Sequence, residues 1–576
     1  MTALNPAAAW NALWRSHDQT KDLLTLKVLR RETAASASGD RVGATATSKK
    51  NAAASSGMTG KGAGKAADGG GTTDGGSTPA GPAYTPAKLT GLILGPLLFI
   101  IFQFIFAPEG LSPEGRSVLA VTLWVATWWI TEAIPIPATS LLPIVLLPLT
   151  GAMTGSDVVS AYGNDTIFLF LGGFAIAIAL EKWNLHQRIA LNIVSALGVS
   201  PKRIILGFMV ATAFLSMWVS NTAATMMMIP VGLAVAHQAA QSLRGAEHQR
   251  DLHHFEKAIL FGIAYAATIG GLGTLIGTPP LAILAATSAD LAGETIGFAQ
   301  WMVVGVPVVV VLLALTWLYM TNISFKVKLK QLPGGAEVIR EQRRGLGRMS
   351  PQEIGVGIVF VFAAFMWITR TFLWQDIFPS LTDGMIAVVA TTLLFLIPAR
   401  ATAPGEKKPS TRLLEWEDSV KIPWGILLLF GGGLAIAAGF TQSGLSEWIG
   451  EQLLGLQGMN SLLIIIVATA LVLALTEITS NTATATMILP VMAAFAVSVG
   501  LHPFALMVPA AMAANCAFML PVGTPPNAVL FATGKVKITE MVRVGFALNI
   551  IALVLLLAAV LLIMPAAWGI DVLGTN

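Results

Sequence analysis

The sequence predicts an all-α polytopic membrane protein with about 11 transmembrane helices and two re-entrant helical hairpins. Three observations support this class. The 576 residues are 55% hydrophobic and only 11% charged, whereas an average soluble protein carries about 25% charged residues. Long apolar segments follow one another from residue 89 to residue 567, and the two halves of that region repeat the same polar motifs. The single cysteine also excludes an intramolecular disulfide and any multi-cysteine metal site.

The N-terminal 86 residues differ from everything that follows. From residue 34 to residue 86 the chain is mostly Ala, Gly, Ser, Thr and Pro, a composition that cannot bury enough apolar surface to fold. We therefore expect a disordered cytoplasmic tail over 1–86. Within it, Trp10 to Leu29 either forms a short interfacial helix or is a partly ordered part of the tail. No cleavable signal peptide is expected, because no apolar core follows the first basic residues.

Thirteen apolar segments account for the membrane region, since a helix that crosses the hydrocarbon core needs about 20 apolar residues. They lie at 89–106, 117–131, 136–153, 164–180, 204–236, 258–289, 300–321, 354–372, 384–399, 422–441, 461–498, 504–533 and 544–567. Several are too long for one crossing and carry polar residues in the middle. These interruptions predict helices that break inside the membrane, or hairpins that enter and return.

The basic residues indicate the orientation. If the tail is cytoplasmic and the segments 204–236 and 461–498 are re-entrant hairpins, all Lys and Arg except Arg116 and Arg370 fall on the cytoplasmic side. The opposite loops carry mainly Asp and Glu. This positive-inside asymmetry predicts a cytoplasmic N-terminus. The formal charge of +4 is thus an orientation signal, and no nucleic-acid partner is expected.

An internal repeat relates the two halves at an offset of 260 residues. Ser220-Asn221-Thr222 recurs as Ser480-Asn481-Thr482, and Gly172-Gly173 recurs as Gly432-Gly433. Two Gly-Thr-Pro-Pro motifs, at 277–280 and 523–526, follow the Ser-Asn-Thr motifs at a slightly shorter offset. By the topology above, one hairpin enters from each side of the membrane. Interrupted helices at matching positions of an inverted repeat predict a transporter with a binding site at the midplane.

The four interruptions suit an anion together with a small cation. Helix N-termini present N–H groups and a partial positive charge to anions, whereas carbonyl, hydroxyl and amide oxygens suit a hard cation such as sodium. No Arg, Lys or His falls within the four motifs, so bound cations would neutralise an anionic solute. Glu132 and Glu477 are either proton or cation sites or, as we favour, hydrogen-bond acceptors for a hairpin backbone.

At these motifs the sequence resembles the divalent anion/sodium symporter family of dicarboxylate, citrate and sulfate carriers. The resemblance rests on Trp-Trp-Ile-Thr-Glu-Ala-Ile-Pro at 128–135, on both Ser-Asn-Thr and both Gly-Thr-Pro-Pro motifs, and on Ile-Pro-Trp-Gly at 422–425. It extends from about 90 to 567. It implies a homodimer whose chains each have a scaffold domain and a transport domain that slides across the membrane as an elevator. The first proline motif ends in Leu281, where the family commonly has Asn.

The resemblance also implies the site residues. One sodium site would consist of Ser216, Ser220, Asn221 and Gly277, and its symmetry-related partner of Thr476, Ser480, Asn481 and Gly523. The substrate carboxylates would contact Asn221, Thr222, Thr278, Asn481, Thr482, Thr524 and Pro525.

The favoured function is sodium-coupled uptake of C4 dicarboxylates such as succinate, malate or fumarate across the cytoplasmic membrane. The alternatives are a sodium-independent dicarboxylate or citrate exchanger, a sodium/sulfate symporter and, in another class, a membrane-embedded enzyme. The enzyme is disfavoured because the sequence lacks a cluster of His, Asp or Glu in its apolar segments. No organic cofactor is expected. The predicted organisation is a tail at 1–86, a first repeat at 87–330, a basic cytoplasmic linker at 331–352 and a second inverted repeat at 353–576.

Overall fold

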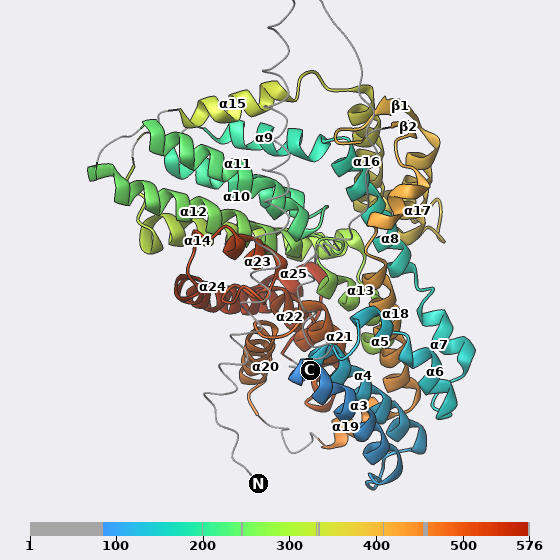
Figure 1. Ribbon diagram of the computed structural model, residues 1–576. Coiled ribbons are helices and arrows are strands. Elements are labelled where there is room, and N and C mark those ends of the chain that lie inside the picture. Colours follow the sequence, from blue (N-terminus) through green and yellow to red (C-terminus); the bar gives the residue numbers. More distant parts are fainter. Residues whose placement is uncertain are drawn as a thin grey trace, which may run out of the picture. The chain divides into compact units, whose positions relative to one another are not determined.

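The structure is a computed structural model that describes residues 85–573 except 199, 243–245, 330, 332–333, 407 and 453–458. The predicted N-terminal tail therefore lies outside the described residues, apart from its last two positions. Residues 86–576 belong to one compact unit. Within the described part, every predicted apolar segment is helical, and the all-α class is confirmed (Figure 1).

The helices before the basic linker are α3 (Pro86–Phe104), α4 (Pro113–Thr131), α5 (Ile136–Thr139), α6 (Leu142–Leu149), α7 (Gly155–Ala161), α8 (Asp165–Lys182), α9 (Leu185–Leu197), α10 (Pro201–Ser216), α11 (Asn221–Ser242), α12 (Ala246–Gly270), α13 (Pro279–Ala292) and α14 (Phe298–Leu318).

The helices from the linker onward are α15 (Gly335–Gly345), α16 (Pro351–Thr369), α17 (Asp383–Leu396), α18 (Trp424–Gln442), α19 (Leu445–Gln452), α20 (Ser461–Thr476), α21 (Asn481–Ser498), α22 (Phe504–Asn515), α23 (Pro525–Ala532), α24 (Ile538–Ala558) and α25 (Met564–Trp568). One antiparallel pair of short strands, β1 (Pro398–Thr402) and β2 (Pro409–Arg412), lies between α17 and α18. It falls in a loop that the sequence analysis predicted only as basic and cytoplasmic.

Local sequence explains where many of these helices begin. Ser112 and Asn164 cap α4 and α8 by accepting hydrogen bonds from backbone N–H groups of the first turn. Ser350 and Glu353 form a reciprocal capping box at the start of α16. Such caps satisfy N–H groups that have no partner within the helix. Several of the long apolar helices therefore have starting points encoded in their own first residues.

The surface of the described part is that of a membrane protein. Nine of its helices are long and apolar enough to cross a membrane. Large apolar side chains on the outer helices are exposed, for example Ile93 of α3 at 62%, Val310 of α14 at 60% and Val361 of α16 at 63%. In contrast, 94% of the apolar window of α12 is buried inside the protein. A soluble protein rarely exposes apolar surface on this scale, so these outer faces fit a lipid environment.

The two halves of the chain use the same local arrangement. Helices α10 and α11 are joined by a short connection and both pack on α12, just as α20 and α21 both pack on α22 (Figure 1). The continuation of each broken helix then crosses to the opposite half, because α13 packs on α21 and α23 packs on α11. The four polar interruptions of the sequence meet where these elements cross.

The glycine pairs at the repeat offset lie at close helix contacts, where small residues let backbones approach. A Cβ atom added to Gly172 of α8 would lie 2.6 Å from the carbonyl oxygen of Ala387 in α17. One added to Gly432 of α18 would lie 2.6 Å from the carbonyl oxygen of Ser140. Only a residue without a side chain permits this approach, so α8 and α18 are held tightly against their neighbours.

Candidate functional site

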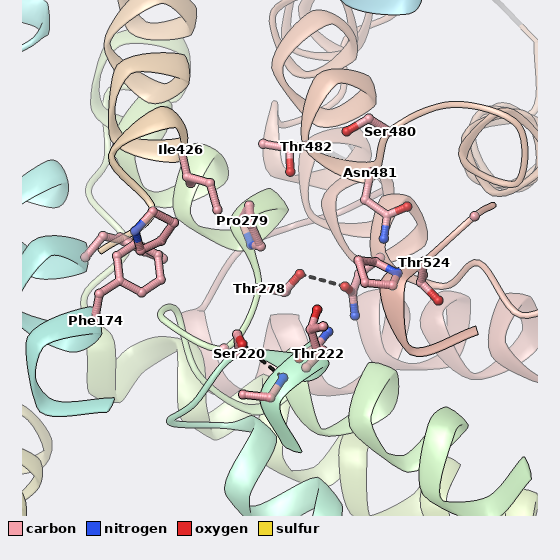
Figure 2. A pocket seen from close by; sticks show the side chains of 18 of the residues that line it. Phe174, Ser220, Thr222, Thr278, Pro279, Ile426, Ser480, Asn481, Thr482 and Thr524 are labelled. Atoms are coloured by element: carbon pink, nitrogen blue, oxygen red, sulfur yellow. Dashed lines mark hydrogen bonds between the residues drawn. The ribbon is translucent and has the colours of Figure 1, made fainter. Parts of the chain in front are cut away.

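A cavity of about 720 Å³ lies where the two helix pairs meet the two broken helices (Figure 2). All four polar interruptions contribute to its wall. The contributing residues are Ser220, Asn221, Thr222, Gly277, Thr278, Pro279, Ser480, Asn481, Thr482, Gly523, Thr524 and Pro525. Figure 2 shows hydroxyl and amide side chains of both repeats turned toward one space. Apolar side chains such as Phe174 and Ile426 complete the lining, and the volume is in the range of small-molecule sites.

Four helices begin at this cavity. Helix α11 starts at Asn221, α13 at Pro279, α21 at Asn481 and α23 at Pro525, and all four residues line the cavity. The aligned peptide dipoles place a partial positive charge at each of these N-termini. Helices α11 and α21 also present first N–H groups that have no partner within the helix, whereas α13 and α23 each begin with two prolines, which lack an N–H group. The cavity therefore attracts an anion from two sides without a cationic side chain in the motifs.

A first cluster of oxygen atoms surrounds the side-chain amide of Asn221. One terminal atom of this amide lies 3.3 Å from the carbonyl oxygens of both Ala267 and Gly277 and 2.5 Å from the Ser216 hydroxyl. The same hydroxyl lies 2.6 Å from the Ala267 carbonyl oxygen. If the terminal atom is nitrogen, the amide donates to the carbonyls. If it is oxygen, the four groups form a set of ligands that suits a hard cation.

A second cluster repeats this geometry around Asn481. A terminal atom of its amide lies 3.1 Å from the Ala514 carbonyl oxygen, 3.2 Å from that of Gly523 and 2.6 Å from the Thr476 hydroxyl. The Thr476 hydroxyl also contacts the Ala514 carbonyl oxygen at 2.6 Å. Oxygen ligands about 2.4 Å from a common cation lie about 3.4 Å from one another. The amide-to-carbonyl distances of 3.1 to 3.3 Å in the two clusters are close to this value, whereas the shorter hydroxyl contacts are hydrogen bonds.

The residues predicted for the site are thus brought together. All of them line the cavity except Ser216 and Thr476, which are fully buried behind the two asparagines. Ser220 accepts a hydrogen bond from the Ala223 N–H and so caps α11. Thr524 accepts one from the Asn527 N–H and caps α23. The side chains of these two residues therefore position helix N-termini as well as face the cavity.

The motif glycines matter because they lack a side chain, and not because they have unusual backbone angles. Neither Gly277 nor Gly523 is among the glycines with positive φ. A Cβ atom at Gly277 would lie 2.5 Å from the carbonyl oxygen of Gly271, whereas the nearest atom to one at Gly523 is the Ala517 methyl carbon at 3.0 Å. Glycine at 277 is therefore required by a close backbone approach.

Glu477 accepts hydrogen bonds from the backbone N–H groups of Phe518, Met519 and Leu520 and from the side-chain amide of Asn549. The carboxylate is buried, and it fastens the loop between α22 and α23 to the end of α20. Glu477 is therefore a hydrogen-bond acceptor for a backbone, as favoured, but the backbone is that of the broken-helix loop and not of a hairpin. Glu132 ends α4 in a left-handed conformation and lines the cavity, and its role stays a prediction.

The two broken-helix loops are held by different side chains, which accounts for the departure at Leu281. Asn527 donates its side-chain N–H groups to the carbonyls of Ala517 and Leu520, at 3.1 and 3.0 Å. Leu281 is buried and cannot make such bonds. In the first half the Trp301 indole N–H instead donates to the Leu272 carbonyl at 3.0 Å, and the Thr274 hydroxyl to that of Met217 at 2.5 Å.

The sequence analysis missed Asn515, Glu181 and Lys421, which also line the cavity. Lys421 is the one cationic side chain among the described lining residues, and it pairs with Asp418 at 3.3 Å. Its position directly before the Ile-Pro-Trp-Gly motif was the available signal. Asn515 lies 1% exposed at the end of α22 and has no copy in the first half, so the repeat could not reveal it.

Broken helices in repeated halves around a polar cavity define a membrane transporter, and not an enzyme. The chain belongs to the family described as the sodium:sulfate symporter transmembrane region, whose model matches residues 87–570.

Relatives of known name support this membership. The chain is 54% identical over 492 residues to the sodium-dependent dicarboxylate transporter SdcS of Staphylococcus saprophyticus, covering 85% of this chain and 94% of that protein. The SdcS protein of Staphylococcus aureus strain MRSA252 is 54% identical over 491 residues, with the same coverage. The structure of Neisseria gonorrhoeae MtrF, reported for a class of antimetabolite efflux pumps, has a TM-score of 0.50 at 12% identity and covers 83% of this chain and 95% of MtrF. That likeness concerns the fold.

Proposed function

We propose that this protein takes up C4 dicarboxylates such as succinate, malate or fumarate together with sodium ions. The observation that carries the proposal is the joint arrangement of four helix N-termini and two oxygen clusters around one cavity. The N-termini attract an anion, and the clusters suit hard cations beside it. The SdcS relatives are sodium-dependent dicarboxylate transporters by name, which supports the same choice of solute and ion.

Each repeat would bind one sodium ion and one carboxylate. The first ion would be held by Ser216, Ser220, Asn221 and Gly277, and the second by Thr476, Ser480, Asn481 and Gly523. The carbonyls of Ala267 and Ala514, which face the two asparagine amides, would complete the two sets. One carboxylate would contact Asn221, Thr222 and Thr278, and the other Asn481, Thr482, Thr524 and Pro525. The hydrogen-bond donors would be the amides and the other threonine hydroxyls, because the Thr278 hydroxyl donates to Asn515 and proline has no N–H group. A sodium ion turns the amide oxygen of each asparagine toward the carbonyls, and this leaves the amide N–H groups free to donate to the carboxylate.

This arrangement couples the two solutes. The binding motifs carry no cationic side chain, so a dianion without sodium would be partly desolvated and uncompensated, which is costly. Two or more sodium ions entering with a dianion make transport neutral or inward positive. Each net positive charge then gains about 2.3 kcal/mol per 100 mV of membrane potential.

The proposed organisation is a homodimer in the cytoplasmic membrane with the N-terminus in the cytoplasm. The first repeat at 87–330 and the second at 353–576 would be joined by the basic linker at 331–352. In each protomer a transport domain that holds the cavity would slide along a scaffold domain as an elevator. The equivalent packing of α10–α12 and α20–α22 supports two repeats of one ancestral unit.

Radiolabelled succinate uptake into proteoliposomes tests this function. We expect strong uptake with external sodium and little when potassium or choline replaces it, because the dianion needs the cations for compensation. Uptake that depends on internal dicarboxylate and not on sodium would identify an exchanger instead. Unlabelled sulfate should compete less well than succinate, since the proposed site receives two separate carboxylates, one at each repeat, and sulfate is a single compact anion. Stronger competition by sulfate would assign the protein to sulfate transport.

The single cysteine gives a second test that needs no transport. Cys516 is fully buried two residues after Ala514, whose carbonyl belongs to the second cluster. Alkylation requires a transient opening that exposes the buried thiol. A ligand that binds only the closed protein lowers the population of the open form by the factor 1 + [L]/Kd. At ten times its dissociation constant, sodium should slow alkylation of Cys516 by a permeant maleimide about tenfold. Equal rates in sodium and potassium would contradict a cation site there.

A further inference from the structure

The side chain of Asn515 joins the two halves of the protein at the floor of the cavity. Its amide oxygen accepts a hydrogen bond of 2.6 Å from the Thr278 hydroxyl, which is the dashed line at Thr278 in Figure 2. Its amide nitrogen donates a hydrogen bond of 2.7 Å to the carbonyl oxygen of Thr268. The residue is 1% exposed. Both functional atoms of the amide are therefore committed to the first repeat, although Asn515 itself belongs to the second.

The two partners of Asn515 are direct neighbours of the first oxygen cluster. Thr268 follows Ala267 and Thr278 follows Gly277, and the carbonyls of Ala267 and Gly277 both face the Asn221 amide. Asn515 itself follows Ala514, whose carbonyl faces the Asn481 amide in the second cluster. Asn515 and its two partners are thus each directly adjacent in the chain to a cluster carbonyl. These are the carbonyls of Ala514, Ala267 and Gly277.

The bridge also lies where the two repeats meet. Ala267 and Ala514 have equivalent places in the two clusters, so Thr268 is the residue equivalent to Asn515. A contact between equivalent residues lies close to the axis that relates the two repeats. The Thr268 hydroxyl does not return the contact, because it bonds to the Ala264 carbonyl of its own helix. Asn515 is therefore an unsymmetrical connection at an otherwise repeated centre.

We propose that Asn515 is a positioning residue that couples the two cation sites, so that sodium at one cluster raises the affinity of the other. A cation in the first cluster fixes the directions of the Ala267 and Gly277 carbonyls, and with them the peptide units of Thr268 and Thr278. The Thr268 carbonyl and the Thr278 hydroxyl hold the side-chain amide of Asn515. The backbone of Asn515 follows directly on Ala514, whose carbonyl belongs to the second cluster. The effect is reciprocal, because coupling between two binding equilibria acts equally in both directions. This inference rests on the proposed function.

The test is the sodium dependence of succinate uptake by the full-length protein in proteoliposomes. Wild type should show a steep, sigmoidal curve. Asn515→Ala should give a less steep curve, no steeper than two independent sodium sites would produce, with a half-saturating sodium concentration roughly five- to tenfold higher, at the lower end of typical coupling between sites. The matched control is Tyr265→Phe. It removes another buried hydrogen bond from α12 to the second repeat, from the Tyr265 hydroxyl to the Phe518 carbonyl at 2.9 Å, and should keep the wild-type steepness.

A second pair of variants keeps the test valid if Asn515→Ala does not fold. Thr278→Ser retains the hydroxyl that donates to Asn515, whereas Thr278→Val removes it. Because Thr278 is also a candidate substrate contact, the measurement here is the sodium dependence of Cys516 alkylation in the absence of substrate. Thr278→Ser should retain a steep dependence and Thr278→Val should not.

The possible outcomes separate the coupling from the function. Sodium-dependent uptake by wild type with a curve no steeper than two independent sodium sites would produce overturns the coupling and leaves the function intact. An unchanged steepness in Asn515→Ala with a lower maximal rate also overturns it and assigns Asn515 to packing alone. Wild-type uptake that is equal in sodium and choline refutes the proposed function, and the coupling with it. Loss of steepness in Asn515→Ala and in Thr278→Val, but not in Tyr265→Phe, supports the proposal.

Discussion

Replacing Asn221 or Asn481 by alanine is expected to reduce sodium-dependent uptake about 100-fold or more while the protein still inserts in the membrane. Each asparagine lies at the first position of a helix that faces the cavity, and its amide contacts a hydroxyl and two carbonyls. In the proposed site, the substitution removes one cation ligand and one donor to a carboxylate together. Losing a hydrogen bond to a charged group costs about 1.5–3 kcal/mol, and the lost cation contact adds to this.

Surface expression and uptake should be measured side by side with Asn322→Ala as the control. Asn322 is exposed, accepts a hydrogen bond from Lys202 and lies outside the cavity, so its replacement should leave uptake near the wild-type value. Uptake above about half of wild type in Asn221→Ala or Asn481→Ala would refute the assignment of these residues to the site.

Asn481→Asp separates the two roles of the amide. Aspartate retains an oxygen for the cation but loses the N–H donors and adds a negative charge that repels the dianion. We therefore expect sodium still to protect Cys516 from alkylation in this variant, while succinate uptake is lost. Loss of sodium protection in Asn481→Asp would indicate that the amide nitrogen, and not the oxygen, faces the Ala514 and Gly523 carbonyls.

Gly277→Ala is expected to abolish uptake almost as completely. The added Cβ atom would lie 2.5 Å from the Gly271 carbonyl oxygen and 2.9 Å from the Gly271 Cα atom. Since both are backbone atoms, the broken-helix loop has to move. The Gly277 carbonyl belongs to the first oxygen cluster, so this displacement should raise the sodium concentration required for uptake beyond the physiological range.

Two other glycine substitutions calibrate this effect. In Gly523→Ala the nearest atom to the new Cβ would be the Ala517 methyl carbon at 3.0 Å, and a modest shift relieves the contact, so we expect a smaller rise in the sodium requirement. Gly155→Ala meets nothing within 4 Å and should behave as wild type. Sodium-activation curves of all three distinguish steric displacement from a general effect of alanine. Equal curves for Gly277→Ala and Gly155→Ala would contradict the close approach at Gly277.

Much of the site could be predicted because its polar motifs interrupt long apolar segments, and do so in both halves of the chain. Polar Ser-Asn-Thr and Gly-Thr-Pro-Pro motifs inside apolar segments leave backbone groups that lipid cannot satisfy, so these motifs have to meet in protein or around a polar cavity. Their recurrence in both halves placed all four at one site, and the structure brings them around one cavity. Likewise, the order of apolar segments determined the helices, since each segment can satisfy its own backbone only as a helix.

The tertiary structure decided what no local or repeated pattern encodes. Helix α13 packs on α21 and α23 packs on α11, although each pair is distant in the chain. Glu477 likewise binds three N–H groups of a distant loop. Near Leu281, the indole of Trp301 replaces the contact that an asparagine makes in the other half. The bridge from Asn515 to Thr268 and Thr278 is the clearest case. An amide at the end of an apolar helix has no sequence signature of its own. Its contacts are one donor, the Thr278 hydroxyl, and one acceptor, the Thr268 carbonyl, and only the folded chain brings them within hydrogen-bonding distance.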